Sequence, residues 1–435
     1  MWHLLLRFEV SNYRSIFEPA ELFVIAGDED RNAVRKFESI SQGVLTTAGI
    51  YAPNASGKSN VVDALYWLSN ALRVSLRFWD DEIAYEPFRF GARPISSTKF
   101  ELEMLVQEVR YVYQIEFDRN GIRAESLYSY PERRRRLLFR REGGQLELRR
   151  GITSLSGIRE LLTNTMMVLS IAAKLQVREI SSFASALSGF GFVGNVSWNT
   201  SRFSRPTWHR STQRIFEEGD GIATQSLFDD IVPGRFTSRE MAMALLRFAD
   251  LGIIEVQIPQ NVLEDLPNTP RLRSNAPGKQ LKLIHGAPGQ ELAFDFAEES
   301  EGTRRWFSLI GPILKTFEFG QVLIIDEIDA GLHSNLSARL VELFQDPSAN
   351  PNNAQLIFTT HDTSLSNHLN RDEVWFTEKG ANGSTSLKAL AEFSGDMVRR
   401  SLNLEKAYLQ GRFGGIPYLD QLAFFRLLGP VASSD

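Results

Sequence analysis

The feature that most restricts the fold of this chain is a short loop between an apolar segment and a helical one. Residues 44–51 predict a strand, and residues 57–74 predict a helix. The loop between them reads Ala52-Pro53-Asn54-Ala55-Ser56-Gly57-Lys58-Ser59, which matches G-x-x-x-x-G-K-[ST] except that Ala52 replaces the first glycine. A strand, such a loop and a helix in this order predict an α/β sheet that binds phosphate groups at its edge.

The residue types of this loop suit the β- and γ-phosphates of a nucleotide. Gly57 lets the backbone approach closely, Lys58 carries a positive charge, and the Ser59 hydroxyl is a ligand that Mg²⁺ accepts. Successive backbone N–H groups and the following helix N-terminus favour an anion. The alternative is a strand-to-helix turn that contains Gly-Lys-Ser by chance. We assign nucleotide binding to Asn54, Ala55, Ser56, Gly57, Lys58, Ser59 and Asn60.

Two carboxylates follow a second apolar segment. Residues 322–325 predict a buried strand, and Asp326 and Glu327 stand at its end. Asp326 is placed to orient Mg²⁺, and Glu327 to polarise an attacking water. Many buried strands end in an acid by chance, but the combination with a phosphate loop favours a catalytic pair.

A third apolar segment, residues 356–361, ends in His361. An imidazole at that position can hydrogen-bond a γ-phosphate or hold a water molecule. A single histidine after a strand is more often a structural residue. His361 and His368 have no third ligand near them in sequence, so the pair does not predict a metal site.

The segment before the acidic strand predicts a capped helix. Ser300 is a suitable N-cap, and Gly302 leaves the helix N-terminus accessible to an anion. By itself this is a simple helix start. The order along the chain gives it more meaning: phosphate loop, Ser-Glu-Gly-Thr-Arg, Asp-Glu, then His.

With these four motifs the chain resembles the heads of ABC-type ATPases in the SMC, RecF and OLD branch. It is more similar still to the abortive-infection ATPases of bacterial phage defence, such as the RloA and AbiL type and the AriA subunit of the PARIS system. The strings that carry the resemblance are LRFEVSNYRSI (6–16), YAPNASGKSN (51–60), SEGTRRWFSLIGPI (300–313), LIIDEIDAGLH (323–333), FTTHD (358–362) and LEKAYLQGRFGGIPYL (404–419).

The resemblance implies a role for each matching residue. Lys58 and Ser59 would bind phosphate and Mg²⁺, and Asp326 would support the metal. Glu327 would be the catalytic base, and His361 would sense the γ-phosphate.

Further roles implied by the resemblance concern a second subunit. Asp329 would lie in the loop that communicates across a dimer, and Ser300 and Gly302 would contact ATP held by the opposite subunit. Arg14 would touch the nucleotide. The glutamine of the Q-loop has no clear counterpart in these strings, and Gln176 is the candidate for it.

The rest of the chain predicts the parts of an ABC-ATPase head with a mixed, helix-covered sheet, an antiparallel β lobe and a helical insertion. Residues 100–105 and 111–117 alternate with period two, as in an antiparallel meander, and residues 155–190 have helical spacing. We expect an N-terminal ATPase lobe over 1–150, a mainly helical insertion over 151–290 and a C-terminal ATPase lobe over 291–435.

Composition excludes several classes of protein. The chain of 435 residues is 43% hydrophobic and 23% charged with a net charge of −5, which excludes a disordered chain and a basic nucleic-acid coat. The absence of cysteine excludes disulfides and thiolate zinc sites. No apolar run reaches the roughly 18 residues that span a bilayer. We expect a cytoplasmic protein without a membrane partner.

The function that these observations favour is an ATP-binding and ATP-hydrolysing sensor or scaffold of an antiphage system. We expect slow ATPase activity with ATP and Mg²⁺, and a homo-oligomer with nucleotide at the subunit interface. Only 74 residues follow His361, too few for a TOPRIM nuclease. The toxic effector, a TOPRIM-like or other nuclease, is therefore expected to be encoded separately, with a phage protein or nucleic acid as a possible trigger.

Two alternatives remain open. One is an SMC/RecF-like DNA-repair ATPase that acts directly on DNA, and another is a nucleotide-binding scaffold with negligible turnover. The run Glu132-Arg133-Arg134-Arg135-Arg136 could contact nucleic acid or an acidic partner, although a solvated hairpin tip is the simpler interpretation. The cluster Asp28-Glu29-Asp30 could imitate a metal pair but is more typical of a solvated turn.

Overall fold

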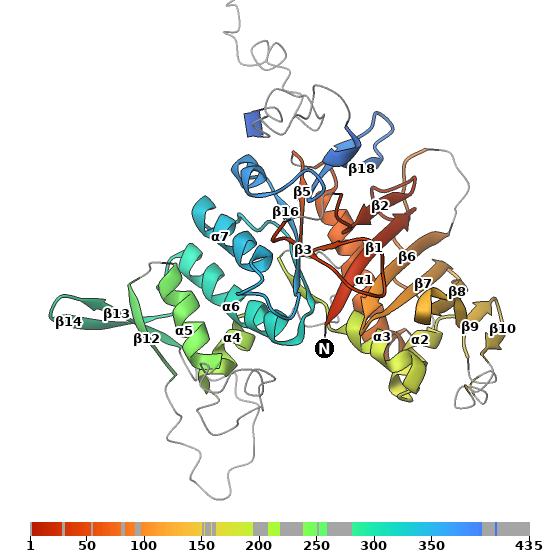
Figure 1. Ribbon diagram of the computed structural model, residues 1–435, viewed down its shortest axis with the longest axis horizontal. Coiled ribbons are helices and arrows are strands. Elements are labelled where there is room, and N and C mark those ends of the chain that lie inside the picture. Colours follow the sequence, from red (N-terminus) through yellow and green to blue (C-terminus); the bar gives the residue numbers. More distant parts are fainter. Residues whose placement is uncertain are drawn as a thin grey trace, which may run out of the picture.

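The computed structural model contains two large sheets with helices between and beside them (Figure 1). The residues that it describes are 2–27, 31–53, 55–79, 83–91, 97–149, 152, 158, 162–194, 208–217, 238–249, 252–258, 281–393 and 405–406. All structural statements below refer to these residues.

The first large sheet is antiparallel and has seven strands in the order β10-β9-β8-β7-β6-β1-β2. Buried and partly exposed residues alternate along β1 and β6, as expected for a sheet with one face covered. The predicted meander is therefore present. Its strands are β1 (His3–Ser11), β2 (Ala20–Phe23), β6 (Thr98–Val106), β7 (Val109–Asp118), β8 (Gly121–Tyr130), β9 (Arg136–Glu142) and β10 (Gln145–Leu148).

The second large sheet is mixed and has six strands in the order β11-β15-β16-β5-β17-β18. The first five run parallel, and only β18 is antiparallel to its neighbour. The expected mixed sheet is thus confirmed. Its strands are β5 (Thr47–Tyr51), β11 (Gly191–Val193), β15 (Val322–Ile325), β16 (Gln355–Thr360), β17 (Val374–Lys379) and β18 (Thr385–Ala389).

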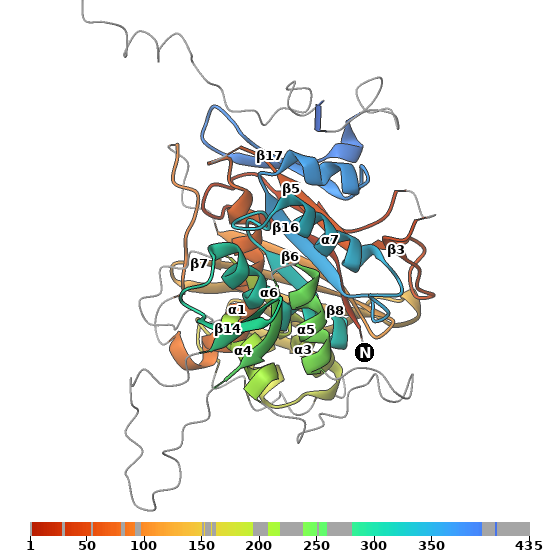
Figure 2. The same cartoon turned by 90° about the vertical axis from the view of Figure 1, so that its left-hand side faces the viewer.

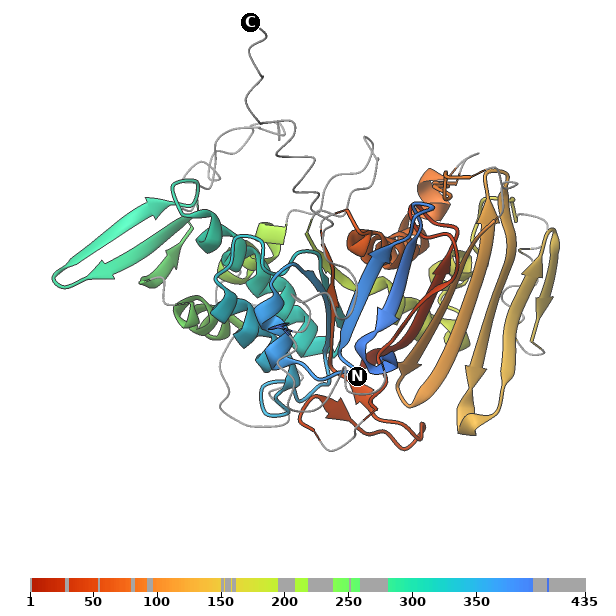
Figure 3. The ribbon, with the colours of Figure 1, turned by 90° about the horizontal axis from the view of Figure 1, so that it is seen from above.

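Helices cover both faces of the mixed sheet, which explains why β15 is apolar at every position and why every residue of β16 is buried. Ile324 and Ile357 belong to a core shared with α1 (Lys58–Phe78) and the antiparallel sheet. Leu323 and Phe358, which point to the opposite face, pack in a second core with α6 (Glu301–Phe319) and α7 (Ser334–Gln345). Figure 3 shows the resulting layers seen from above.

Helix α1 fills the space between the two large sheets. Its Trp67 is 1% exposed and stacks on Phe117 of β7, with ring centroids 4.4 Å apart and an interplanar angle of 3°. This aromatic contact fixes α1, and hence the loop that precedes it, on both sheets.

The expected helical region before residue 190 is shorter and divided. The two helices are α2 (Val168–Lys174) and α3 (Arg178–Ser188), and the spacing that pointed to a helix from residue 155 was wrong for residues 162–167. The buried carboxylate of Glu125 accepts hydrogen bonds from the backbone N–H groups of Val168 (2.7 Å) and Leu169 (2.9 Å). A carboxylate at a helix N-terminus satisfies otherwise unpaired donors and sets where the helix begins.

A smaller group of elements lies beside α6 (Figure 2). Helix α4 falls in a region without clear periodicity, yet it packs tightly on α6, where Thr212 Oγ1 donates to Phe307 O at 2.7 Å. The elements of this group are α4 (Trp208–Glu217), α5 (Ser238–Phe248), β12 (Ile253–Gln257), β13 (Lys282–Ala287) and β14 (Gln290–Asp295). The last three form an antiparallel sheet.

The remaining short elements are a two-stranded sheet and three 3-10 helices. They are β3 (Val34–Arg35), β4 (Val44–Leu45), η1 (Pro131–Arg133), η3 (Thr363–His368) and η4 (Leu390–Glu392). Among the helices described, none is both long and apolar enough to cross a membrane. The division into 1–150, 151–290 and 291–435 stays a prediction.

Candidate functional site

The phosphate loop, the acidic pair and His361 come together because their strands are neighbours. β15 and β16 are parallel partners, and β16 also pairs with β5. The carboxyl ends of parallel strands lie at one edge of a sheet, which is where open α/β sheets bind ligands. The sequence motifs at these three strand ends therefore form one site.

Lys58 is held inside this site, with only 5% of its surface exposed. Its Nζ donates to the carbonyl oxygens of Ala52 (2.7 Å) and Pro53 (3.3 Å), so the side chain folds back over the loop. Burial lowers the pKa of Lys58 to about 8, and nearby Asp326 and Glu327 oppose this shift. A buried ammonium without a paired anion is a strong binding group for phosphate.

The Lys58 ammonium also contacts His361. Nζ lies 3.0 Å from Nε2 and 3.2 Å from Nδ1 of the imidazole. Burial, and then the positive charge of Lys58, lower the pKa of His361, which favours a neutral ring at pH 7. A neutral imidazole can accept one hydrogen bond and donate another.

Ser59 and Asp326 provide two oxygen atoms side by side. Ser59 Oγ donates to Asp326 Oδ1 at 3.1 Å. Asp326 is almost completely buried, and Thr359 Oγ1 donates to the same oxygen at 2.6 Å. Thr359 thereby fixes the orientation of the carboxylate.

Glu327 follows in an unusual backbone conformation. Its φ is 54°, in the left-handed region that few non-glycine residues adopt, and its N–H donates to Thr359 Oγ1 at 2.8 Å. Oε1 lies 4.0 Å from Nε2 of His361, with the carboxylate partly exposed. Left-handed residues of this kind occur where the surrounding structure imposes them, often at functional sites.

Four hydrogen bonds that sequence reasoning missed support this acidic turn. Thr360 Oγ1 donates to Asp329 Oδ1 at 2.7 Å, and the N–H of His361 donates to the same oxygen at 3.3 Å. Arg305 Nη2 donates to the carbonyl oxygens of Asp326 and Glu327 at 3.3 and 3.4 Å. The available signal for Thr359 and Thr360 was a polar pair directly after the apolar run of residues 356–358 in β16.

The phosphate loop also packs against residues far away in sequence. Thr385 Oγ1 of β18 donates to Ser56 O at 2.8 Å, and Ser56 Oγ lies 2.9 Å from Thr377 Oγ1 of β17. A Cβ atom on Gly57 would lie 2.1 Å from Thr385 Oγ1, and Gly57 has a φ of +98°. Glycine is required there by both space and backbone conformation.

Ser300 is the N-cap of α6, and Gly302 is the second residue of this helix. Ser300 is exposed, and its Oγ accepts the N–H of Thr303 at 3.1 Å, as an N-cap does. A Cβ atom on Gly302 would lie 2.8 Å from Gly331 O, so the helix start touches the turn that follows Asp329.

The other expected site residues lie in different surroundings. Arg14 forms ion pairs with Asp63 of α1 and, at 2.9 Å, with Glu86, so a nucleotide contact stays a prediction. Asn60 Nδ2 donates to Ser15 Oγ at 2.5 Å, and Ala55 has a φ of 63°. Asn54 and the cluster Asp28-Glu29-Asp30 lie outside the described residues.

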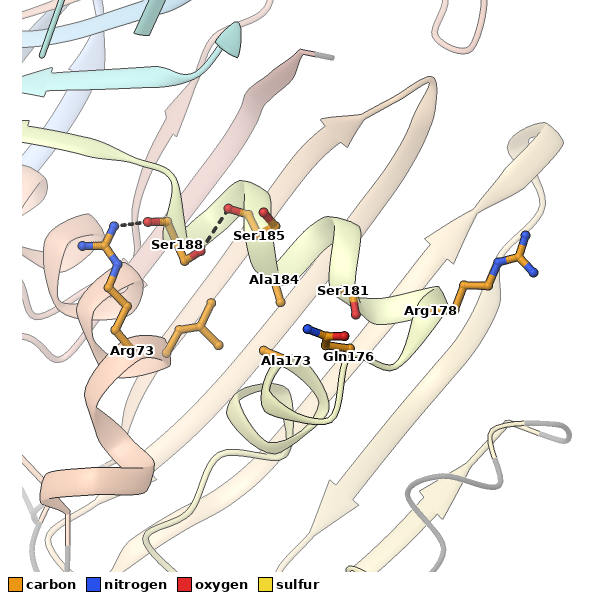
Figure 4. Close-up of a pocket in the computed structure, with 9 residues that line it drawn as sticks. Arg73, Ala173, Gln176, Arg178, Ser181, Ala184, Ser185 and Ser188 are labelled. Carbon is orange, nitrogen blue, oxygen red and sulfur yellow. Dashed lines mark hydrogen bonds between the residues drawn. The ribbon is translucent and has the colours of Figure 1, made fainter. Parts of the chain in front are cut away.

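Gln176 is far from the phosphate loop. It lies in the turn between α2 and α3 and lines a cavity of about 690 Å³ together with Arg73 (Figure 4). Arg73 is 15 residues after Lys58 on α1, which corresponds to about 22 Å along a helix. This position is unsuited to a contact with phosphate.

The donor atoms fit the groups that the motifs predict. A serine hydroxyl and a carboxylate are hard oxygen ligands of the type that Mg²⁺ takes when phosphates and water complete its shell. Within the described residues, no three His, Asp or Glu side chains are grouped as a metal site made by protein alone. The site therefore suits a metal that arrives with a nucleotide.

Three SMC heads are among the solved structures to which this chain is similar. The SMC head domain from Thermotoga maritima is 12% identical, with a TM-score of 0.41 over 89% of this chain and 99% of that chain. An SmcHead bound to the C-winged helix domain of ScpA is 14% identical, with a TM-score of 0.43 over 88% and 97%. An Smc head with an extended coiled coil, bound to the C-terminal domain of ScpA derived from Pyrococcus furiosus, is 13% identical, with a TM-score of 0.43 over 94% and 99%.

No curated protein matches the chain in sequence. One family matches it over residues 48–164 and 197–367, more than half of its length, and these segments contain the phosphate loop, the acidic pair and His361. The chain therefore belongs to the family described as "AAA domain, putative AbiEii toxin, Type IV TA system".

Proposed function

We propose that this protein is an ATP-hydrolysing sensor or scaffold of a bacterial abortive-infection system that controls a separately encoded toxic effector, a nuclease. The observation that carries the ATPase part is the convergence of Lys58, Ser59 and Asp326 at one edge of the mixed sheet. The family description, which names a type IV toxin–antitoxin system, supports the cellular role.

In this proposal each residue acts on the phosphates or on water. Lys58 exchanges its bonds to the loop carbonyls for bonds to the β- and γ-phosphates. Ser59 and Asp326 would hold Mg²⁺, which would supply positive charge to neutralise the phosphates. Glu327 orients and polarises the attacking water, because it is the partly exposed carboxylate at this edge.

His361 completes the polar end of the site. Its ring contacts Lys58 and faces Glu327, so it is placed to donate to a γ-phosphate oxygen or to hold the water. Because its pKa is lowered, the neutral ring keeps both a donor and an acceptor at pH 7.

The second half of each site is proposed to come from another copy of the chain. Ser300 is exposed at the N-terminus of a 19-residue helix, where unpaired N–H groups favour an anion. Ser300 and Gly302 would contact the triphosphate held by the partner, and Asp329 would transmit the contact through the turn at Gly331. ATP then stabilises the closed dimer, and hydrolysis weakens it.

A mixing experiment tests the shared site. Lys58→Ala removes the phosphate loop charge, and Ser300→Arg blocks the helix start, so each variant alone should hydrolyse ATP very slowly. Mixed in equal amounts, they should regain about a quarter of the wild-type rate, because half of the dimers are mixed and each mixed dimer has one complete site. No recovery would mean that Ser300 does not act on a partner's nucleotide.

A second experiment tests the cellular role. Glu327→Gln should bind ATP, favour the closed dimer and hydrolyse ATP at least about a hundredfold more slowly than wild type. Co-purification of a nuclease encoded beside this chain, retained by Glu327→Gln with ATP and lost in Lys58→Ala, would support the effector. Wild type without measurable turnover would favour a nucleotide-binding scaffold instead.

A DNA-repair ATPase is the second candidate, because four consecutive arginines are exposed in the turn after β8 and at the start of β9. Arg133, Arg134, Arg135 and Arg136 are all exposed, although Arg133 also donates to Glu38 O and the Arg135 guanidinium lies 4.0 Å from the Tyr128 ring. Binding of duplex DNA that weakens steeply with salt, and that is lost when these arginines are replaced by serine, would favour this function.

A further inference from the structure

The order of strands in the mixed sheet gives the nucleotide site two distinct sides. β5, which leads into the phosphate loop, has β16 on one side and β17 on the other. The acidic pair and His361 follow β15 and β16, so the γ-phosphate end must lie on that side. A nucleoside attached to the other end of the phosphates is therefore directed toward β17 and β18.

The hairpin of β17 and β18 is fixed directly to the phosphate loop. Thr385, the first residue of β18, bonds to Ser56 O and contacts Ser15 Oγ at 2.7 Å. Ser15 in turn accepts a hydrogen bond from Asn60, the second residue after Lys58. Polar side chains therefore line this side of the phosphate loop as far as Thr385. The turn of the β17–β18 hairpin, residues 380–384, lies directly beyond Thr385.

An exposed aromatic ring lies against that hairpin turn. Phe90 is 63% exposed, the most exposed large hydrophobic side chain among the described residues. A Cβ atom on Gly383 would lie 3.2 Å from Cδ2 of the Phe90 ring, so the ring rests on the backbone of Gly383. Gly383 is two residues before Thr385, a span of at most about 7 Å.

The loop that carries Phe90 is held near the site by its own contacts. The N–H of Phe88 donates to Asn12 Oδ1 at 3.1 Å, and the N–H of Arg14 donates to Glu86 O at 2.7 Å. The ring centroids of Phe88 and Phe90 are 5.7 Å apart. Residues 83–91 are thus bound to the turn that also presents Ser15.

We propose that Phe90 is the stacking platform for the base of the bound nucleotide. An exposed phenyl ring beyond the nucleoside end of a phosphate loop offers a π face to a base but no hydrogen bond. Stacking of this kind tolerates different bases, so Phe90 would favour a nucleoside triphosphate over bare triphosphate without selecting adenine over guanine. This inference rests on the proposed ATP-binding function.

The test compares ligands with and without a base. Dissociation constants of ATP, GTP and tripolyphosphate would be measured by calorimetry for wild type, Phe90→Ala, Phe90→Leu and Phe90→Trp. Phe90→Ala and Phe90→Leu should weaken ATP and GTP about tenfold each and leave tripolyphosphate unchanged, since only the stacking contact is lost. Phe90→Trp should retain wild-type affinity.

Phe248→Ala is the matched control, because Phe248 of α5 is 46% exposed and lies at the end of a helix beside α6. It should bind all three ligands as wild type does. Unchanged ATP affinity in Phe90→Ala would overturn the proposal that Phe90 stacks on the base. An equal loss of affinity for ATP and tripolyphosphate would also overturn it, because that result would show a disturbed phosphate loop. If wild type itself binds no ATP, the proposed function fails, which is a different result.

Discussion

Thr359 Oγ1 joins the two carboxylate residues of the acidic strand end: it donates to Asp326 Oδ1 at 2.6 Å and accepts the N–H of Glu327 at 2.8 Å. One buried hydroxyl thus fixes the side chain of Asp326 and the backbone of Glu327 at once. The position of both acids depends on β16, the strand that separates them from the phosphate loop.

Replacing Thr359 by valine should therefore impair catalysis more than folding. The isosteric change removes one of the two donors to Asp326 Oδ1, since Ser59 remains, and leaves the backbone N–H of Glu327 without its partner, which should cost about 2 kcal/mol of stability. We expect the ATPase kcat to fall about tenfold as Asp326 and Glu327 lose their orientation. Thr359→Ser, which keeps the hydroxyl, should stay near wild type, and equal rates for both variants would contradict this role.

Nucleotide affinity should decrease with rising pH because of Lys58. Its pKa of about 8 in the free protein means that the side chain loses its charge as the pH rises through 8. Phosphate binding needs the charged form, so binding takes up a proton, and Kd should increase toward about tenfold per pH unit above 8. Calorimetry at pH 7 and 9 in buffers of different ionisation enthalpy measures this uptake.

The control for this pH dependence is Lys58→Arg, whose guanidinium stays charged over the whole range. Its affinity is expected to be lower but independent of pH. A wild-type affinity that is the same at pH 7 and 9 would show that Lys58 is not the titrating group.

Gly57→Ala should destabilise the protein through a specific clash. The new Cβ would lie 2.1 Å from Thr385 Oγ1 and 2.7 Å from Ser15 Oγ, in addition to the strain of a φ of +98°. We expect a loss of about 3 kcal/mol in the free energy of unfolding. Gly91→Ala is the control, since Gly91 has a similar φ of +92° with nothing within 4 Å of its added Cβ. Similar losses for both would remove the clash as the cause.

Glu125→Ala should weaken the antiparallel sheet and α2 together. The carboxylate accepts the N–H groups of Val168 and Leu169 and the hydroxyl of Tyr113 at 2.9 Å, and burial raises its pKa. Its removal leaves three donors unsatisfied, which should cost about 3 kcal/mol in urea denaturation. Tyr113→Phe removes only one of these contacts and should cost about 1 kcal/mol. A smaller effect for Glu125→Ala than for Tyr113→Phe would contradict this account.

Local signals in the sequence were sufficient for the elements that carry the chemistry. The apolar runs before Ala52, Asp326 and His361 predicted β5, β15 and β16, because strands buried on both faces are apolar throughout. The motif also predicted the glycine at position 57. The structure explains why no larger residue fits there, because an added Cβ would clash with Thr385.

Contacts between distant parts of the chain could not be read in the same way. β17 and β18 were not predicted, although Val374-Trp375-Phe376 is an apolar run, and their place beside β5 depends on a crossover that no local pattern records. The role of Thr385 at the phosphate loop depends on that placement, and so does that of Phe90. The start of α2 at Val168 depends on a hydrogen bond to Glu125, which lies 43 residues earlier in the chain.

The position of β5 between β16 and β17 has a consequence for synthesis on the ribosome. Both neighbours of this strand are made more than 300 residues after it. A nascent chain cannot complete the sheet around its phosphate loop until almost all of the described residues have emerged, since such distant pairing must wait for both partners. A chain that stops before residue 355 therefore lacks both of the strands that flank β5 and its phosphate loop.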